Sequence, residues 1–169
     1  DVKLVAGDTM NYWIHGNRPA LLQVLKGLDI LLINDGEARM LADEKNLVRA
    51  AHAVMDMGPR ALVVKHGEYG ATLFFGGDGT ASKTFRAPAM PLEEVVDPTG
   101  AGDSFAGGFF GYLASQPRLT PEAFRRAMFY GSVMGSFAVE RFGTERLQLL
   151  SREEIDDRFN AFRELTHLD

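Results

Sequence analysis

The sequence predicts an α/β fold of three layers, αβα, with a mostly parallel central β-sheet. Two observations support this class. Short apolar runs alternate with amphipathic segments, which is typical of a parallel sheet covered by helices on both faces. The alternation then gives way to two strands around a glycine-rich turn, which indicates a hairpin at the edge of the sheet. We expect residues 1–169 to form a single α/β domain.

Three short apolar runs are each followed by glycine or a turn signal, so we expect buried strands there. Two further strands are expected in "ATLFFGGDGTASKTFRAP", around the turn Gly76–Gly79, as a hairpin at the edge of the sheet. The three buried strands are Val2–Ala6, Asp29–Asn34 and Ala61–Gly67.

Five segments repeat apolar residues at helical spacing or begin with a helix-capping pattern. Thr120 and Ser151 are each followed by an acid in the first turn, which is typical of a helix start. The second segment is expected to break near Asp43. The predicted helices are Pro19–Gly27, Glu37–Met57, Gly102–Ser115, Pro121–Glu140 and Arg152–Leu165.

Composition excludes several classes of function. The formal net charge is −5, which gives no basic field for nucleic acid or an anionic membrane. The chain has no cysteine, so disulfides, zinc thiolate sites and cysteine nucleophiles are excluded. No apolar run reaches the roughly 18 residues that a membrane span needs. The four histidines have no recognisable ligand spacing. We therefore expect a cytoplasmic protein.

The segment "VVDPTGAGDSFAGGFFGYLA", residues 95–114, has features of an anion site. Gly100, Ala101 and Gly102 offer main-chain N–H donors at the start of a helix, where the partial charge is positive. Asp103 places a carboxylate in the first turn, where it can accept a proton. Alternatively, the glycines only allow close packing and Asp103 only complements the helix dipole. Two other phosphate patterns are excluded: Phe105 stands where a dinucleotide fingerprint needs glycine, and there is no Gly-Lys-Ser/Thr.

The longer stretch "DPTGAGDSFAGGF" resembles the C-terminal signature of the PfkB, or ribokinase-like, carbohydrate kinase family. Three more segments are similar to that family in order and context. They are "DILLINDGEARML", "LVVKHGEYGATLF" and "GSVMGSFAVERFGTE". The resemblance spans the chain from the first strand to at least Gly143, and it implies a ribokinase-like fold.

The resemblance implies transfer of the γ-phosphate of ATP to a hydroxyl of a sugar or nucleoside. Asp103 would be the catalytic base, and the amides of Gly100, Ala101 and Gly102 would hold the moving phosphoryl group. Asn34 and Glu37 would help to hold Mg²⁺ and its waters, since this cation prefers oxygen ligands. The alternative for Asn34 and Glu37 is a turn and the first turn of a helix.

The resemblance also implies nucleotide contacts. Lys65 and Gly67 fall where the family contacts phosphates, although family members often carry threonine at the position of Lys65, and Gly70 completes the paired glycines. Asp97 and Thr99 either shape the loop or form a site for a monovalent cation such as K⁺. The residues that would line an adenine pocket, with helix packing as the alternative, are Ser132, Val133, Ser136 and Gly143.

Family members carry an N-terminal half with most of the sugar contacts and a small β lid. The present sequence begins in an apparent strand without methionine, so we expect it to be the C-terminal, nucleotide-binding and catalytic half. The partners implied are a small-molecule sugar or nucleoside and a second copy, in a homodimer through the lid region. Two alternatives to a kinase stay open: a nucleotide-binding or regulatory fragment without turnover, and a structural α/β fragment.

Overall fold

The computed structural model describes residues 4–76 and 83–166. The chain divides into two compact units. The first comprises Asp1–Gly67 and Ala71–Arg86, and the second comprises Glu68–Gly70 and Ala87–Asp169. The prediction of a single domain stays a prediction.

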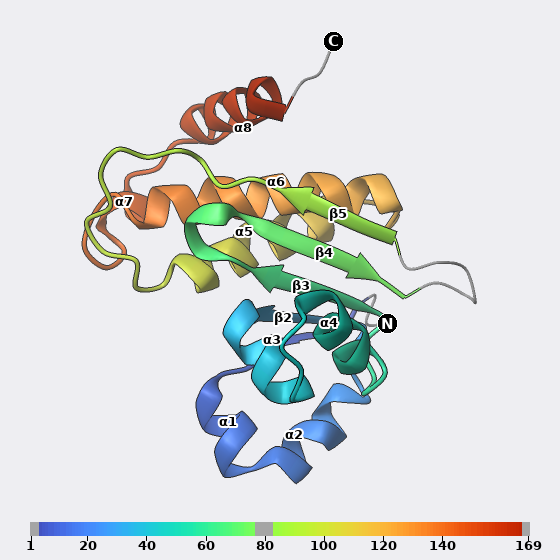
Figure 1. The fold of residues 1–169 in the computed structure, drawn as a ribbon. Coiled ribbons are helices and arrows are strands. Elements are labelled where there is room, and N and C mark those ends of the chain that lie inside the picture. The colour runs from blue at the N-terminus through green and yellow to red at the C-terminus, as the bar shows by residue number, and fades with distance from the viewer. Residues whose placement is uncertain (1–3, 77–82, 167–169) are drawn as a thin grey trace. The chain divides into compact units, whose positions relative to one another are not determined.

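The first unit is built on a sheet of strand order β1-β2-β3-β4-β5 (Figure 1). The strands β1 (Ala6–Asp8), β2 (Ile30–Asn34) and β3 (Ala61–Lys65) are parallel, and β4 (Ala71–Phe75) pairs antiparallel with β3. The last strand is β5 (Lys83–Ala87). The predicted hairpin strands are therefore present, whereas most of the predicted turn, residues 77–79, lies outside the described residues.

The bounds predicted for the first strand were wrong. Residues 2 and 3 of the predicted strand lie outside the described residues, Leu4 and Val5 are not in a strand, and β1 runs from Ala6, opposite Ile30, to Asp8. The reason is local: the Val5 amide donates to the Asp29 carboxylate (2.9 Å) instead of joining the strand ladder. The other two buried strands were predicted to within two residues at each end.

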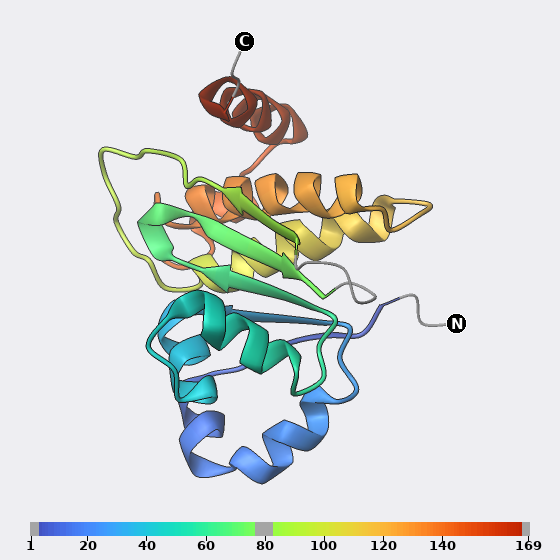
Figure 2. The ribbon, with the colours of Figure 1, turned by 45° about the vertical axis from the view of Figure 1, so that its right-hand side comes forward.

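The helices of the first unit lie on one side of the sheet, as Figures 1 and 2 show. Their apolar residues pack on Leu31 and Ile33 of β2 and on Leu62 and Val64 of β3. Since both faces of β2 and β3 are buried, their continuous apolar sequence is explained. The helices are α1 (Asn11–Gly16), α2 (Arg18–Leu25), α3 (Asp35–Ala42) and α4 (Leu47–Met55).

The break predicted near Asp43 is present between α3 and α4. Asp43 adopts a left-handed conformation with φ of 51°, which ends α3. The side chain of Asn46 then accepts hydrogen bonds from the amides of Val48 and Arg49, and so begins α4.

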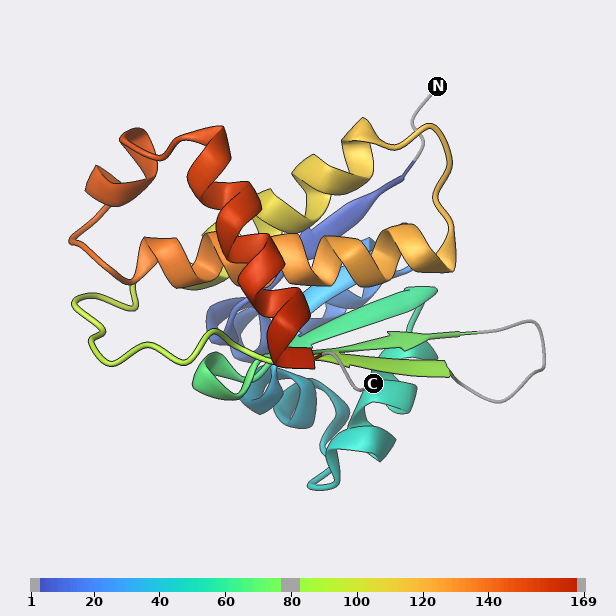
Figure 3. The same cartoon turned by 90° about the horizontal axis from the view of Figure 1, so that it is seen from above.

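The second unit consists mainly of the helices α5 (Ala101–Ser115), α6 (Pro121–Ala138), α7 (Glu145–Gln148) and α8 (Arg152–Thr166). A 3₁₀ turn at Gly67–Tyr69 spans the boundary of the units in sequence. Figure 3 shows α8 crossing α6. This contact buries Phe162 against Val133 and Phe137. The capping role predicted for Thr120 is confirmed, since its hydroxyl accepts from the Ala123 amide (3.2 Å).

Small residues allow α5 and α6 to approach closely. A Cβ added at Gly108 would lie 2.4 Å from the Tyr130 carbonyl oxygen, so only glycine fits at this crossing. The aromatic side chains of α5 fill the space beside it, with Phe105 and Phe109 buried. The start of α5 is thereby fixed to the rest of the second unit.

Candidate functional site

The glycine turn of the second unit forms the start of α5. Gly100 is the residue before the helix and has φ of 78°, a left-handed conformation that favours glycine. Asp97 closes the turn from the other side, because one of its carboxylate oxygens accepts from the Thr99 amide (3.0 Å). The Ser104 amide donates to the Gly100 carbonyl (2.8 Å) as the first helical bond.

The amides of this turn are not equivalent. Ala101 donates its N–H to the Pro98 carbonyl at 3.2 Å. Within residues 4–76 and 83–166, the amides of Gly102 and Asp103 donate to no protein acceptor. Unpaired N–H groups and the dipole of a 15-residue helix together favour an anion at this position. Of the three predicted donors, the amides of Gly100 and Gly102 have no acceptor among the described residues, and the amide of Ala101 is engaged internally. The Asp103 amide is a further free donor.

Asp103 lies in the first turn of α5 and is exposed. Its carboxylate forms no hydrogen bond or ion pair with any residue that the structure describes. An exposed, unpaired carboxylate one residue from free amides is available to accept a proton from a bound hydroxyl.

Asp97 connects the turn to the chain that follows α6. The Thr99 amide is the main cause that lowers the pKa of Asp97, with the Thr99 side chain second and the backbone of Gly143 a smaller cause. The amides of Val96 and Asp97 both donate to the Val139 carbonyl, at 2.8 and 3.3 Å. Asp97, Thr99 and Gly143, all predicted site residues, are thus brought together.

In the first unit, the predicted residues gather at the carboxyl ends of the parallel strands. Asn34 at the end of β2 lies opposite Lys65 at the end of β3. The Lys65 ammonium pairs with Asp8 at the end of β1 (2.9 Å). In open α/β sheets ligands bind outside these strand ends, so the position fits a binding role for Lys65 and for Gly67, two residues further on.

Sequence reasoning missed Asp8 as part of this group. The available signal was its position at the end of a predicted parallel strand, where side chains of neighbouring strands meet. The Asp8–Lys65 pair joins residues 57 positions apart. Asp8 also accepts from the Thr9 amide (2.7 Å), which fixes its carboxylate.

Asn34 and Glu37 form a reciprocal cap at the start of α3. The Asn34 side-chain oxygen accepts from the Glu37 amide (2.7 Å), and the Glu37 carboxylate accepts from the Asn34 amide (2.9 Å). This is the structural alternative left open by the sequence. It leaves lone pairs on both side chains, because an amide oxygen has two and a carboxylate about four. One amide and one carboxylate therefore still fit a magnesium ion held partly through waters.

Gly70 has a clear structural role. A Cβ at this position would lie 2.2 Å from the Ala87 carbonyl oxygen, so the close approach of two backbone segments requires glycine. This contact accounts for Gly70 without a nucleotide.

The α6 residues predicted to line an adenine pocket are mostly buried. Val133 packs against Phe137 and Phe162, as expected for a core residue. Ser132 is 8% exposed. The Ser136 hydroxyl donates to the Val133 carbonyl (2.7 Å) and accepts from Arg158 of α8 (3.2 Å).

Among the described residues, no group of three or more histidine, cysteine or acidic side chains is arranged to hold a metal ion. Nor does any helix in residues 4–76 and 83–166 have the length and apolar content to cross a membrane.

Comparison with known proteins identifies relatives of this chain. Residues 6–149 match the family described as pfkB family carbohydrate kinase. A cytidine kinase of Thermococcus kodakarensis is 36% identical over 104 residues, covering 59% of this chain and 35% of that protein. The chain thus spans about a third of the length of this curated relative.

Solved structures of kinases are also similar to this chain. An aminoimidazole riboside kinase from Salmonella enterica, complexed with aminoimidazole riboside and an ATP analogue, superposes with a TM-score of 0.77 at 23% identity, covering 92% of this chain and 52% of that one. A putative ribokinase II from E. coli, in complex with ATP and Mg²⁺, gives 0.68 at 29% identity, covering 85% and 43%. The predicted fold class is confirmed: this is a ribokinase-like αβα fold with a mixed five-stranded sheet.

Proposed function

The chain belongs to the pfkB family of carbohydrate kinases, and on this premise we propose that it moves the γ-phosphate of ATP to a hydroxyl group of a sugar or nucleoside. One observation carries the proposal. Free amides of Gly102 and Asp103 stand at the start of α5 beside the exposed carboxylate of Asp103. Phosphoryl transfer needs these two elements, an anion-stabilising group and a proton acceptor.

The proposed reaction uses the residues of the turn directly. The acceptor hydroxyl oxygen attacks the γ-phosphorus, its proton passes to Asp103, and the bond between the γ-phosphorus and the bridging oxygen breaks to release ADP. The amides of Gly102 and Asp103, with the backbone of Gly100 and Ala101 forming the turn, stabilise the charge on the moving phosphoryl group. A general base of this kind contributes roughly 10²- to 10⁴-fold in rate.

The residues at the strand ends are proposed to bind phosphates and metal. Lys65 supplies a positive charge to nucleotide phosphates, and Gly67 allows the chain to pass close to them. Asn34 and Glu37 help to hold Mg²⁺, which neutralises phosphate charge when bound. Their lone pairs left free by the cap at α3 support this role.

Nucleotide recognition is proposed for the end of α6 and the loop beyond it. The adenine pocket is proposed to be lined by Ser132, Ser136 and Gly143, while Val133 packs beneath them. Asp97 and Thr99 are proposed to shape the turn or to border a monovalent cation such as K⁺. The hydrogen bonds from the Val96 and Asp97 amides to the Val139 carbonyl support a connection between the end of α6 and the turn.

A second candidate is nucleotide binding or regulation without turnover. The 104 matched residues cover 35% of the cytidine kinase relative, so activity on an acceptor stays a proposal. Orienting the acceptor hydroxyl supplies much of the rate in such reactions, so the acceptor side matters. The acceptor's identity, a homodimer and a cytoplasmic location stay predictions.

The proposal is tested with ATP and Mg²⁺ and with one variant. We expect ATP with Mg²⁺ to raise the melting temperature, and we expect turnover on a panel of sugars and nucleosides. Asp103→Asn should lose turnover by about 10²- to 10⁴-fold while keeping ATP binding. Glu122→Gln, which alters the first-turn acid of α6, is the matched control and should stay active.

Three outcomes distinguish the kinase from the second candidate and test the role of Asp103. Binding with turnover that depends on Asp103 supports the kinase. Binding without turnover on any acceptor supports the second candidate. Equal turnover of Asp103→Asn and the unaltered protein would show that Asp103 is not the base.

A further inference from the structure

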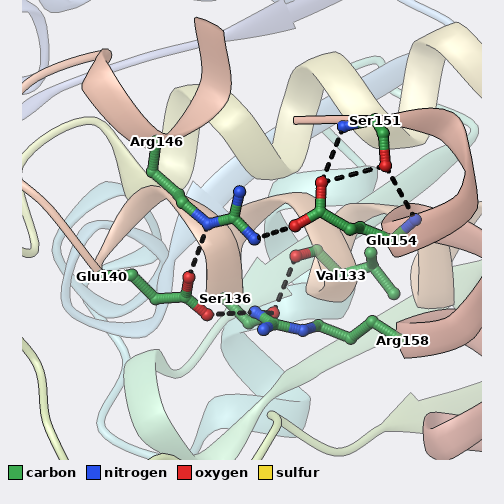
Figure 4. Close-up of polar contacts among 7 residues, drawn as sticks. All are labelled: Val133, Ser136, Glu140, Arg146, Ser151, Glu154 and Arg158. Carbon is green, nitrogen blue, oxygen red and sulfur yellow. Dashed lines mark hydrogen bonds and ion pairs between the residues drawn. The ribbon is translucent and has the colours of Figure 1, made fainter. Parts of the chain in front are cut away.

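Two arginines enclose the carboxylate of Glu140 at the end of α6. Arg146 of α7 contacts one oxygen of Glu140 at 2.8 Å, and Arg158 of α8 contacts the other at 2.6 Å. Figure 4 shows these three side chains converging from separate segments. We call Glu140, Arg146 and Arg158 the arginine clasp. Arg146 also reaches Glu154, which extends the network to the start of α8 (2.6 Å).

The clasp is shielded from solvent. The side chains of Arg146 and Arg158 are 18% and 20% exposed, and Glu140 is 25% exposed. Both guanidinium groups also lie against the ring of Phe137, at 4.8 and 3.4 Å from its centroid. Shielded ion pairs are screened less than surface pairs and hold their partners in a fixed geometry.

The clasp is connected to the residues proposed to contact the nucleotide. Arg158 donates to the Ser136 hydroxyl (3.2 Å), as Figure 4 shows. Glu140 directly follows Val139, whose carbonyl accepts from the amides of Val96 and Asp97. Asp97 in turn bonds Thr99, next to Gly100. A continuous set of contacts within the second unit thus runs from α8 to the glycine turn.

Stability alone is a weak explanation for such a network. Replacing partly buried ion pairs by apolar side chains of similar volume is often neutral or stabilising. A fixed arrangement at one point of the chain is the better attested use of buried charge. The point that the clasp fixes is the chain from Val139 to Gly143, which holds Asp97.

We propose that Arg146 and Arg158 are positioning residues that act through Glu140 to set the Val139–Gly143 segment and the turn at Asp97–Gly100 for nucleotide binding. This inference rests on the proposed function. Neither arginine needs to touch the nucleotide. Loss of either one releases one oxygen of Glu140 and weakens the hold on the Val139–Gly143 segment and on the turn at Asp97–Gly100.

The test compares Arg146→Met and Arg158→Met with Arg152→Met. Arg152 is the matched control, because it begins α8, has a side chain 75% exposed, and among the described residues forms an ion pair with Asp156 alone (3.1 Å). Three quantities are measured on the same protein: the Kd for ATP with Mg²⁺ by calorimetry, the melting temperature, and amide hydrogen exchange of residues 95–103 without nucleotide.

We expect both clasp variants to raise the Kd for ATP by about 2- to 30-fold and to speed exchange at residues 95–103. Arg152→Met should change neither. If a methionine variant does not fold, Glu140→Gln replaces it, since this change keeps the side-chain shape and removes the charge that both arginines bind. It should act in the same direction.

The outcomes separate the two proposals. ATP binding with unchanged Kd and exchange in every clasp variant overturns the positioning role and leaves the proposed function standing. If the protein binds no ATP, the proposed function is refuted, and with it the effect of the clasp on nucleotide binding. Faster exchange in the clasp variants would then still support the mechanical link between the clasp and the turn. A Kd raised equally in Arg152→Met would also overturn the inference.

Discussion

Asp8 and Lys65 form an ion pair of 2.9 Å across the carboxyl ends of β1 and β3, over the end of the strand β2 between them. The pair places one positive and one negative charge beside Asn34, which lies opposite Lys65 in the sheet. Asp8 therefore competes with any anion for Lys65, and this competition gives the two residues opposite expected effects on phosphate binding.

The first prediction concerns that pair. Lys65→Met should weaken ATP binding because it removes a charge from the phosphates, whereas Asp8→Asn should strengthen binding because it releases Lys65. Each change should cost about 1 kcal/mol of unfolding free energy or less, as expected for a partly exposed pair. Calorimetric titration with ATP and Mg²⁺ measures the affinity. Lys45→Met, at an exposed lysine after α3, is the control. Equal affinity in all three variants would remove Lys65 from the phosphate site.

The second prediction concerns Gly100. Because φ is 78° there and no atom lies within 4 Å of an added Cβ, Gly100→Ala introduces backbone strain without a clash. It should lower the unfolding free energy by about 1–2 kcal/mol and reduce phosphoryl transfer. Gly107→Ala is matched, since its Cβ also has free space but it lies inside α5, and it should raise stability by about 1 kcal/mol. Denaturant unfolding measures the stability of both variants, and activity assays measure phosphoryl transfer. A gain in stability of Gly100→Ala would contradict the predicted backbone strain.

The third prediction separates capping from metal binding at Asn34. Asn34→Ala should cost about 1 kcal/mol because the cap of α3 is lost, and it should also weaken the Mg²⁺ dependence of ATP binding. Asn46→Ala removes the cap of α4 at a similar cost, with no effect on Mg²⁺. Titration of ATP with and without Mg²⁺ tests both. Identical Mg²⁺ dependence of the two variants would leave Asn34 as a cap alone.

The fourth prediction concerns pH. The Ser151 amide is the main cause that lowers the pKa of Glu154 to about 2, with Arg146 and the Ser151 hydroxyl next. Because the folded state has the lower pKa, the stabilisation is complete above the ordinary value of 4.5 and is lost as pH falls toward about 2. The unfolding free energies of the unaltered protein and of Glu154→Gln, measured from pH 6 to about 2, should converge as the pH falls. Glu153→Gln is the control, and curves that stay parallel would contradict the shift.

Much of the fold was predictable from local patterns. β2 and β3 are continuous apolar runs, and α6 begins with a threonine cap, so periodicity and capping were enough. The helices α1 and α7 were not predicted. Both are short, and neither has a side chain that caps its first turn. Thr144 followed by Glu145 is a start pattern for α7 that was overlooked, whereas α1 begins after Met10 without one.

The candidate site could be predicted from the sequence only where a single segment of the chain forms it. Gly100 and Asp103 are neighbours in sequence, and a turn followed by a helix places them together without long-range contacts. The Asp8–Lys65 pair depends on the order and register of strands far apart in sequence, which no local pattern specifies. The arginine clasp likewise needs the packing of α8 on α6, which buried aromatic residues determine.

The contact of α5 and α6 at Gly108 has a consequence for motion. Where two helices meet backbone to backbone, with a carbonyl oxygen 2.4 Å from the place a side chain would begin, neither can slide or rotate without the other. Any movement of the glycine turn at Asp97–Gly100 must then move both helices together. Relaxation dispersion should detect a single exchange rate common to α5 and α6, with no hinge inside either helix.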